Sequence, residues 1–243
     1  MPEVENAHAM SHPSVMDFQG EEVVVTGGTG ALGRAVVARL LEAGARCVIP
    51  VFDARELEGC SFAGHDRVEL VHDVDLTDEA DVARLFSAPK RLFASIHLAG
   101  GFSMAPIERT ELSSFEGLVR MNLTTCFLSC REAARRMQGE GRIVNVAAKP
   151  ALVPTGGLAV YAATKSAVAG LTLSLAEELA PRGIWVNAVV PSIMDTPANR
   201  AAMPDADHGR WPSVEGVAET ITFLASRENA VTRGALVSVY GHS

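Results

Sequence analysis

The sequence predicts an α/β fold in which a doubly wound parallel sheet is flanked by helices on both faces. Three observations support this prediction. Strand-like apolar runs alternate with helical patterns, a glycine-rich turn follows the first strand, and no repeat or linker divides the 243 residues. Strands joined by helices form right-handed βαβ units, which assemble into a parallel sheet covered on both faces. A chain of this length suits one domain with one continuous core.

The individual elements follow from the hydrophobic period. Residues 21–26 form a β-branched run, and residues 31–44 carry apolar side chains at helical spacing up to a glycine that favours a helix end. Further strands are predicted at 46–52, 67–74, 91–100, 141–148, 184–190 and 234–240. Further helices are predicted at 78–86, 111–138, 161–183 and 214–226. Residues 191–213 form one long irregular segment, and a loop of that length is usually functional.

The first 19 residues are acidic and polar, so we expect a flexible leader before a single domain at 20–243. The leader has neither the basic start nor the apolar centre of a secretory signal. A net charge of −8 without a basic stripe argues against nucleic acid as a partner. No apolar run approaches the ~20 residues that a bilayer requires, so no membrane partner is expected. With unpaired thiols, these features indicate a cytoplasmic protein.

Four cysteines occur, and none forms a Cys-x-x-Cys pair. Cys126 and Cys130 lie four positions apart in the predicted helix 111–138, so they share a face. Two thiols on one helix can begin a metal site, but in the sequence no cluster of His or Cys completes it. We therefore expect small buried hydrophobic side chains and no metal.

The glycine-rich turn lies between the first strand and the first helix. Glycines 27, 30 and 33 are spaced by three, which lets the backbone approach a pyrophosphate. The helix that follows offers N–H groups and the positive end of its dipole. This context is typical of a Rossmann-type dinucleotide-binding domain. Cofactor contacts are predicted for Gly27, Thr29, Gly30, Ala31, Leu32 and Gly33.

The segment after the second strand bears on the choice between NAD(H) and NADP(H). A carboxylate there bonds a ribose 2′-hydroxyl and repels a 2′-phosphate. Asp53 lies 20 residues after Gly33 and is the candidate, so the sequence favours NAD(H). Arg34 and Arg55 are near enough in sequence to accept a phosphate instead.

Asp75 and Leu76 follow the third predicted strand and are placed to meet an adenine ring. The alternative role for Asp75 is to cap the helix that begins near Thr77 and Asp78, since aspartate is a preferred N-cap residue.

Tyr161 and Lys165 are one helical turn apart, so their side chains share a face. Hydride transfer needs a proton donor or acceptor at the substrate, and an ammonium one turn away favours the phenolate of a tyrosine. We predict that Tyr161 is the acid/base, the alternative being a core tyrosine and a surface lysine. Asn122 is predicted to bond backbone, or a water that leads to Lys165, and otherwise marks a helix bend.

The ordered set of motifs resembles the short-chain dehydrogenase/reductase family over about residues 21 to 240. It comprises the glycine turn, Asp75, Ala99-Gly100, Asn122, Tyr161-Ala-Ala-Thr-Lys165, and Pro191 with Thr196. The resemblance implies that Lys165 reaches the nicotinamide ribose. Further implied cofactor contacts are Ala99, Gly100, Pro191, Ile193 and Thr196. It also implies a homodimer or homotetramer, formed by the helices at 111–138 and 161–180 through an alanine-rich face, with strand 234–240 available for a second interface.

The departures from the family pattern point to a narrower likeness. Ala148 stands thirteen residues before Tyr161, where the family commonly has a serine, and His97 stands where it has an asparagine. His97 is expected to have a structural role. Ala148-Lys149, Asp195-Thr-Pro-x-Asn-Arg200 and Trp211 look like dihydropteridine reductases. That likeness implies reduction of a quinonoid dihydropterin by NADH with a Tyr-x-x-x-Lys pair and no serine.

Without the serine hydroxyl, Tyr161 must polarise the substrate alone, and one such donor is worth ~10²–10³ in turnover. We therefore expect an activated imine-like or quinonoid substrate. Predicted substrate contacts are Ala148, Lys149, Asn199, Trp211 and, as an alternative to Asn199, Arg200. Two other functions remain open, namely a carbonyl or alcohol dehydrogenase that uses Tyr161 alone, and a nucleotide-binding regulatory protein that has lost turnover.

Overall fold

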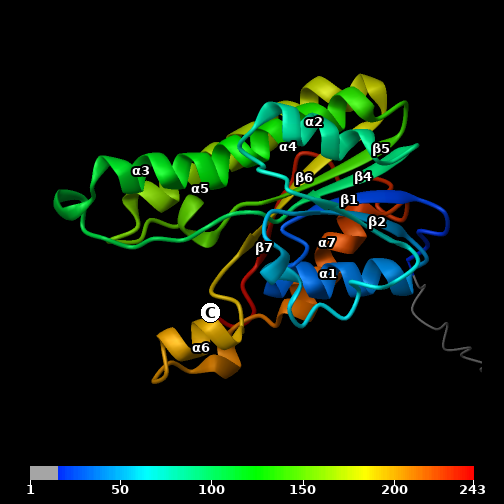
Figure 1. Cartoon of the computed structure of the whole chain (residues 1–243). Helices are drawn as coiled ribbons and strands as arrows, with labels where there is room; N and C mark the ends of the chain where they lie inside the picture. The colour runs from blue at the N-terminus through cyan, green and yellow to red at the C-terminus, as the bar shows by residue number, and fades with distance from the viewer. Residues whose placement is uncertain (1–15) are drawn as a thin grey trace, which may run out of the picture.

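A computed structural model describes residues 16–243 as one sheet covered by helices (Figure 1). The seven strands pair in parallel in the order β3-β2-β1-β4-β5-β6-β7. They are β1 (Glu22–Thr26), β2 (Arg46–Val51), β3 (Val68–His72), β4 (Leu92–His97), β5 (Gly141–Val146), β6 (Ile184–Pro191) and β7 (Leu236–Val239). The predicted fold class is confirmed. The strand order reverses between β1 and β4, and ligands of such sheets bind at the carboxyl ends on either side of that point.

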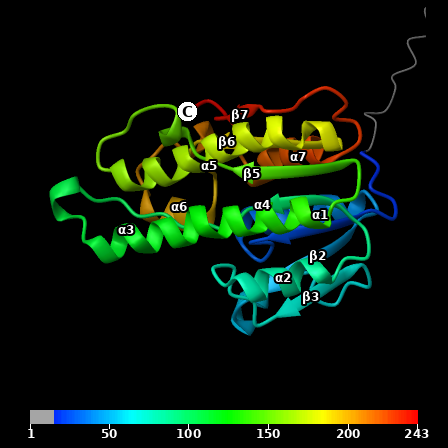
Figure 2. The same ribbon diagram turned by 90° about the horizontal axis from the view of Figure 1, so that it is seen from above.

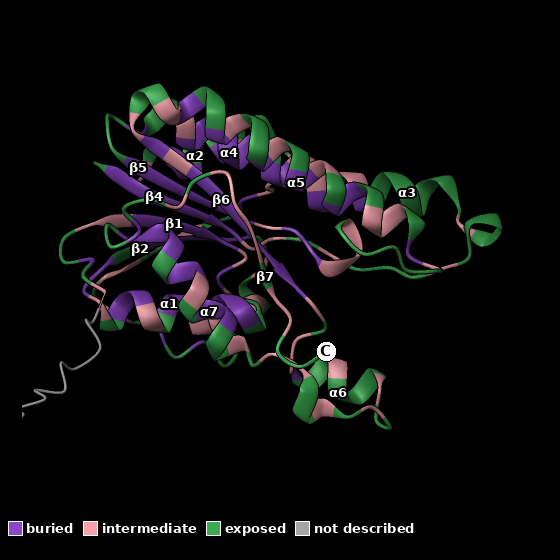
Figure 3. Ribbon diagram, turned by 180° about the vertical axis from the view of Figure 1, so that it is seen from behind, coloured by how far each residue is buried: buried purple, intermediate pink, exposed green. Residues whose placement is uncertain are grey.

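The helices form a layer on each face of the sheet. Helices α1 (Ala31–Glu42) and α7 (Val214–Ala225) cover one face, while α2 (Glu79–Ser87), α4 (Thr125–Arg136) and α5 (Ala159–Leu179) cover the other (Figures 1 and 2). Each layer buries its own apolar cluster, with Leu40 and Ile221 on the first face and Leu85 and Leu179 on the second. The five inner strands, β2, β1, β4, β5 and β6, are therefore buried on both sides (Figure 3), which explains their nearly continuous apolar runs.

The domain begins earlier than the predicted boundary at residue 20. Phe18 is fully buried, its ring packs edge-on against Phe93 at 6.3 Å, and its backbone N–H donates to the Ala43 carbonyl. Met16 packs against the same core cluster. The rest of the predicted leader, residues 1–15, lies outside the described residues.

The long helix predicted at 111–138 is divided into three parts. They are α3 (Leu112–Leu118), a π-helical turn (Val119–Thr124) and α4. A π-turn inside a helix frequently marks a functional position. This one contains Asn122, which is buried and directed toward the sheet end.

The segment predicted to be irregular contains a short helix, α6 (Pro197–Ala202). The Thr196 hydroxyl accepts a hydrogen bond from the Asn199 N–H, and Pro197 occupies the first helical position, so the segment carries the usual start signals of a helix. Both α3 and α6 project beyond the same end of the sheet and are largely exposed (Figures 1 and 3).

One helical stretch, Ala159–Arg182, is long and apolar enough to cross a bilayer by length and composition alone. Within it, Val168, Ala176 and Leu179 are buried in the cluster between α5 and the sheet. The same helix brings Tyr161 and Lys165 to the end of the sheet. Packing against the sheet accounts for part of its apolar composition, since 33% of its 18-residue apolar window is buried.

Candidate active site

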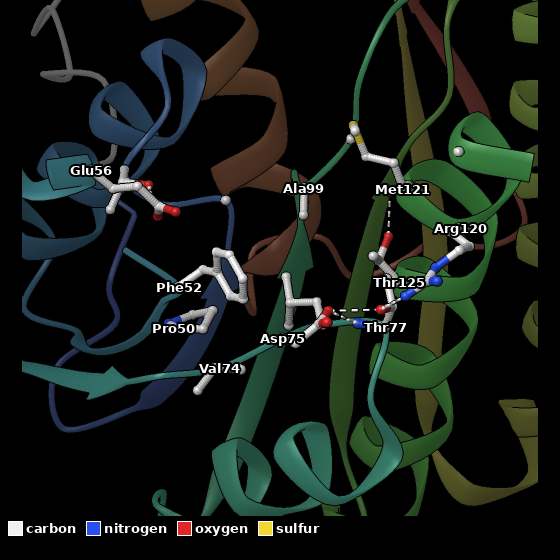
Figure 4. Close-up of a pocket in the computed structure, with 15 residues that line it drawn as sticks. Pro50, Phe52, Glu56, Val74, Asp75, Thr77, Ala99, Arg120, Met121 and Thr125 are labelled. Carbon is white, nitrogen blue, oxygen red and sulfur yellow. Dashed lines mark hydrogen bonds between the residues drawn. The ribbon is translucent and has the colours of Figure 1, made fainter. Parts of the chain in front are cut away.

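Two adjoining cavities lie at the carboxyl ends of β1 and β4, where the strand order reverses. The first has a volume of about 710 Å³ and lies beside the ends of β2 and β3 (Figure 4). The second, of about 350 Å³, lies between the start of α1 and the start of α5. Gly27 and Gly100 line both cavities, so the two form one continuous cleft.

The glycine turn between the cavities fits a dinucleotide. Gly27 has φ +69°, and a Cβ there would lie 2.7 Å from the Ala99 nitrogen. A Cβ on Gly33 would lie 2.1 Å from the Gly27 oxygen. Within residues 16–243, no side chain caps the α1 N-terminus at Gly30, and its first turn holds no acidic residue. The backbone N–H groups and the helix dipole are thus available to a pyrophosphate.

The carboxylate beside the first cavity is Glu56 rather than Asp53. Asp53 turns away to pair with the Arg55 guanidinium, which lowers the pKa of the Asp53 carboxyl, and it does not line either cavity of the described chain. A 3₁₀ turn, Ala54–Leu57, follows Asp53 and returns Glu56 to the cavity wall. There Glu56 accepts a 3.1 Å hydrogen bond from the Thr29 hydroxyl. The structure thus places Glu56 on the cavity wall, and the role of Asp53 toward the ribose stays a prediction.

Both arginines that were candidates for a phosphate are bonded elsewhere. Arg34 donates from Nε to the Thr29 carbonyl at 2.7 Å and from its Nη2 to the Glu58 carbonyl at 2.9 Å. Arg55 pairs with Asp53, as described above. Neither lines the cavity walls formed by residues 16–243.

Asp75 and Leu76 line the first cavity, as predicted. The Asp75 carboxylate also holds the following turn, because its Oδ1 accepts from the Thr77 N–H at 2.8 Å and the Thr77 hydroxyl at 2.7 Å (Figure 4). The N-cap of α2 is Asp78. Asp75 is thus a turn-forming carboxylate on the cavity wall, and its role toward adenine stays a prediction.

Tyr161 and Lys165 enter the second cavity from the first turns of α5. The Tyr161 ring packs edge-on against Phe102 at 5.0 Å, and burial raises the pKa of Tyr161 to about 12. Burial also lowers the pKa of Lys165 to about 8. The helical spacing predicts that Lys165 lowers the pKa of Tyr161. In the described structure the pKa is instead raised, and burial is the cause. Tyr161 is accordingly a protonated phenol at neutral pH.

Asn122 joins three elements beside this pair. Its side-chain oxygen accepts from the Gly101 N–H at 2.8 Å, and its nitrogen donates to the Gly101 carbonyl and the Thr164 hydroxyl, each at 3.1 Å. A Cβ on Gly100 would lie 2.8 Å from the Asn122 oxygen and 3.3 Å from Lys165 Nζ. The predicted bonding of Asn122 to backbone is confirmed, and its part in a proton relay stays a prediction.

Among the predicted substrate contacts, Ala148 and Asn199 line the second cavity. The Lys149 ammonium instead lies 4.9 Å from the Tyr240 ring centroid, and Trp211 packs against His208 at 4.6 Å. Arg200 forms a bidentate pair with Asp195.

In this structure Lys149 and Trp211 lie off both cavity walls, so the roles predicted for them toward the substrate are not supported. Ile193, a predicted cofactor contact, also lies off these walls and is 45% exposed. The remaining predicted cofactor contacts line the cleft. They are Gly27, Thr29, Gly30, Ala31, Leu32, Gly33, Asp75, Leu76, Ala99, Gly100, Tyr161, Lys165, Pro191 and Thr196.

Comparison with known proteins matches residues 21–207 to the family described as short chain dehydrogenase. The chain is 31% identical over 233 residues to a 3-alpha-(or 20-beta)-hydroxysteroid dehydrogenase of Mycobacterium bovis, covering 91% of this chain and 88% of that protein. It is 27% identical over 250 residues to a gluconate 5-dehydrogenase of Gluconobacter oxydans, covering 96% and 98%. A short-chain type dehydrogenase/reductase structure from Mycobacterium ulcerans superposes with a TM-score of 0.87 at 27% identity, covering 93% of this chain and 90% of that chain.

Proposed function

Because the chain belongs to the short chain dehydrogenase family and is an NAD(P)-dependent oxidoreductase of it, we propose that it reduces an activated conjugated ring, such as a quinonoid dihydropterin. Ala148 carries this proposal. It stands in the wall of the cavity that contains Tyr161 and Lys165, and its methyl group donates no hydrogen bond. A substrate that is already activated needs less polarisation than a plain ketone.

The chain's own residues supply binding and a proton. The α1 N-terminus and the glycine turn would hold the cofactor pyrophosphate, and the nicotinamide would lie in the second cavity. When bound, the reduced cofactor supplies the hydride. Tyr161 donates its phenolic proton to the substrate atom that gains electron density, and its phenol carries that proton at neutral pH.

Apolar side chains dominate the wall around Tyr161. Leu98, Phe102, Val146 and Met194 line the second cavity together with Ala148. Such a wall suits the face of a flat ring and excludes water from the reacting atoms. Within residues 16–243 the Tyr161 hydroxyl has no hydrogen-bond partner, so it is available to a substrate.

We propose NAD(H) as the cofactor, on the charges around the first cavity. Glu56 carries a negative charge at the cavity wall and is held there by Thr29, whereas Arg34 and Arg55 are bonded elsewhere. A 2′-phosphate beside Glu56 would meet a carboxylate, and like charges repel. Arg120, which also lines this cavity, donates to the Thr77 hydroxyl.

Reduction of an ordinary carbonyl group is the second candidate. The relatives named above are a hydroxysteroid dehydrogenase and a gluconate dehydrogenase, so their names refer to hydroxyl and carbonyl chemistry. Tyr161 alone provides the proton in this case too. The difference lies in the electrophile, since a plain carbonyl benefits more from a second hydrogen-bond donor.

The outer face of α3, α4 and α5 supports a homodimer. Phe115, Phe127 and Leu173 expose between 43% and 45% of their surface there, beside the small residues Ala163 and Gly170. Ala169, one of the alanines of the alanine-rich face predicted for the helix at 161–180, is buried within its own chain. Two copies packed through these helices would cover the apolar side chains, as in the interfaces of obligate homodimers.

Steady-state kinetics test the proposed reaction. We expect NADH oxidation with quinonoid dihydropterin to exceed that with simple ketones in kcat/KM, and NADH to be preferred to NADPH. Parallel assays with hydroxysteroids and sugar ketones cover the second candidate. Fast reduction of plain ketones without pterin activity would overturn the proposal in favour of that candidate.

A further inference from the structure

Three buried side chains meet beneath the active site without taking part in the chemistry described above. His97 ends β4, and Cys126 and Cys130 lie one turn apart on α4. One ligand atom from each lies within 4.8 Å of the others, and all three residues are buried. We propose that His97, Cys126 and Cys130, with the Asn145 oxygen as fourth ligand, form a structural site for a thiolate-binding divalent cation, zinc above all.

Three of the four interatomic distances given below match tetrahedral coordination. Zinc bonds of about 2.3 Å to sulfur and about 2.0–2.1 Å to nitrogen place those two ligand atoms roughly 3.5 Å apart. Cys130 Sγ lies 3.5 Å from His97 Nδ1 and 3.4 Å from Asn145 Oδ1, and Cys126 Sγ lies 3.5 Å from the same oxygen. The His97–Asn145 separation of 2.8 Å needs to widen by a few tenths of an ångström.

The surrounding hydrogen bonds hold two of these ligands from behind. His97 Nε2 lies 2.7 Å from the Ser95 hydroxyl, and the Asn145 amide nitrogen donates to the Thr172 hydroxyl at 2.9 Å. If Nε2–H donates to Ser95, the lone pair of Nδ1 faces the two sulfur atoms. Partners of this kind orient the ligands of protein metal sites.

Hydrogen bonding alone satisfies this cluster poorly. If Nδ1 carries the proton, three donors, namely this nitrogen and both thiols, approach the two lone pairs of the Asn145 oxygen. If Nε2 carries it, Nδ1 and the Asn145 oxygen are two acceptors only 2.8 Å apart. A divalent cation with two thiolates is electrically neutral and bonds all four atoms at once, so it removes this mismatch without leaving a buried net charge.

The position of the site connects it with the catalytic wall. Asn145 directly precedes Val146, whose carbonyl accepts a hydrogen bond from Lys165. A cation bound to β4, β5 and α4 would therefore fix the strand end that holds Lys165. The sequence alone did not predict such a site, because His97 is far from the two cysteines along the chain. The packing of α4 against β4 brings it near them, and the pairing of β4 with β5 places it beside Asn145.

Metal content of the full-length protein tests the proposal directly. The chain is expressed in zinc-supplemented medium and purified without chelator, and a second sample is refolded with zinc because the buried site fills during folding. We expect about one zinc per chain. Cys130→Ser should lose it, while Cys47→Ser, which alters another buried cysteine on β2, should retain it.

Cobalt substitution provides a readout that does not depend on a variant folding. The wild-type protein refolded with Co²⁺ should show thiolate-to-cobalt charge transfer and the visible bands of tetrahedral cobalt. Zinc contents near zero in both samples, cobalt bound without a thiolate band, or a Cys126–Cys130 disulfide in the mass spectrum would each overturn the proposal. Equal zinc loss in Cys47→Ser and Cys130→Ser would also do so.

Discussion

Lys165 Nζ donates a 2.9 Å hydrogen bond to the carbonyl oxygen of Val146 at the end of β5. The bond ties the first turns of α5 to the sheet and holds the ammonium in a buried position. Burial disfavours the charged form, so the pKa of Lys165 falls to about 8. Near pH 8 Lys165, which lines the second cavity, is therefore present both as the ammonium and as the neutral amine.

This burial predicts a pH-dependent difference in stability between the wild type and Lys165→Met. Below pH 8 both folded and unfolded wild-type chains carry the charge, and the cost of burying it is fully present. Between pH 8 and 10 the unfolded chain binds more protons, so wild-type stability rises with pH. Over this range we expect the free energy of unfolding of the wild type to rise by about 2 kcal/mol relative to that of Lys165→Met.

Denaturant titrations at several pH values measure this difference. The scan stops at pH 10 because the raised pKa of Tyr161 lowers stability only above that value. Lys90→Met, which alters an exposed lysine, should run parallel to the wild type. A Lys165→Met curve that also runs parallel would contradict the burial argument.

Tyr161→Phe removes the proposed proton donor and preserves the ring that packs against Phe102. We expect kcat to fall by about 10²–10⁴-fold, the usual contribution of a general acid, with cofactor affinity little changed. Stopped-flow rates and cofactor fluorescence titration separate the two effects. Tyr240→Phe, which alters the second tyrosine of the chain, is the control. Full activity in Tyr161→Phe would assign the proton to another group.

Glu56→Gln should increase kcat/KM for NADPH about tenfold relative to NADH, because it removes a negative charge near the proposed site of a 2′-phosphate. Glu58→Gln is the matched control, since it removes the same charge from the same segment at an exposed position. Equal shifts in both variants would indicate a general effect of charge and would argue against a specific role of Glu56.

Ala148→Ser places a hydroxyl in the wall of the second cavity. We expect kcat/KM for plain ketones to rise by up to about 10²-fold, and kcat/KM for an activated ring to change little. Ala151→Ser adds the same group in the turn that follows and should leave both values unchanged. If ketone reduction does not improve, polarisation by a second donor does not limit this reaction.

Leu173→Glu should weaken the proposed dimer, because it places a charge on the apolar outer face of α5. Sedimentation velocity at micromolar concentration compares it with the wild type and with Phe223→Glu, the same kind of change on α7 across the sheet. A wild-type chain that sediments as a monomer would remove the dimer proposal.

Helix and strand assignments from the sequence were accurate where the local pattern is strong. The strands predicted at 21–26 and 184–190 occur at Glu22–Thr26 and Ile184–Pro191, because their apolar runs are buried on both faces. The short helix at Pro197–Ala202 was missed because the segment lacks a long apolar period, although its Thr-Pro start was visible. Phe18 was assigned to the leader because one aromatic residue in a polar segment has no period at all.

By itself the sequence determined the fold class, a doubly wound parallel sheet. It also determined the glycine turn and the placement of Tyr161 and Lys165 one turn apart. These features depend on neighbours within a few residues, where period, turn chemistry and helical spacing act directly. Tertiary structure alone decided that Glu56 replaces Asp53 at the cleft and that His97 meets Cys126 and Cys130. Such contacts depend on how strands pair and where a turn redirects a side chain, and spacing along the chain does not encode either.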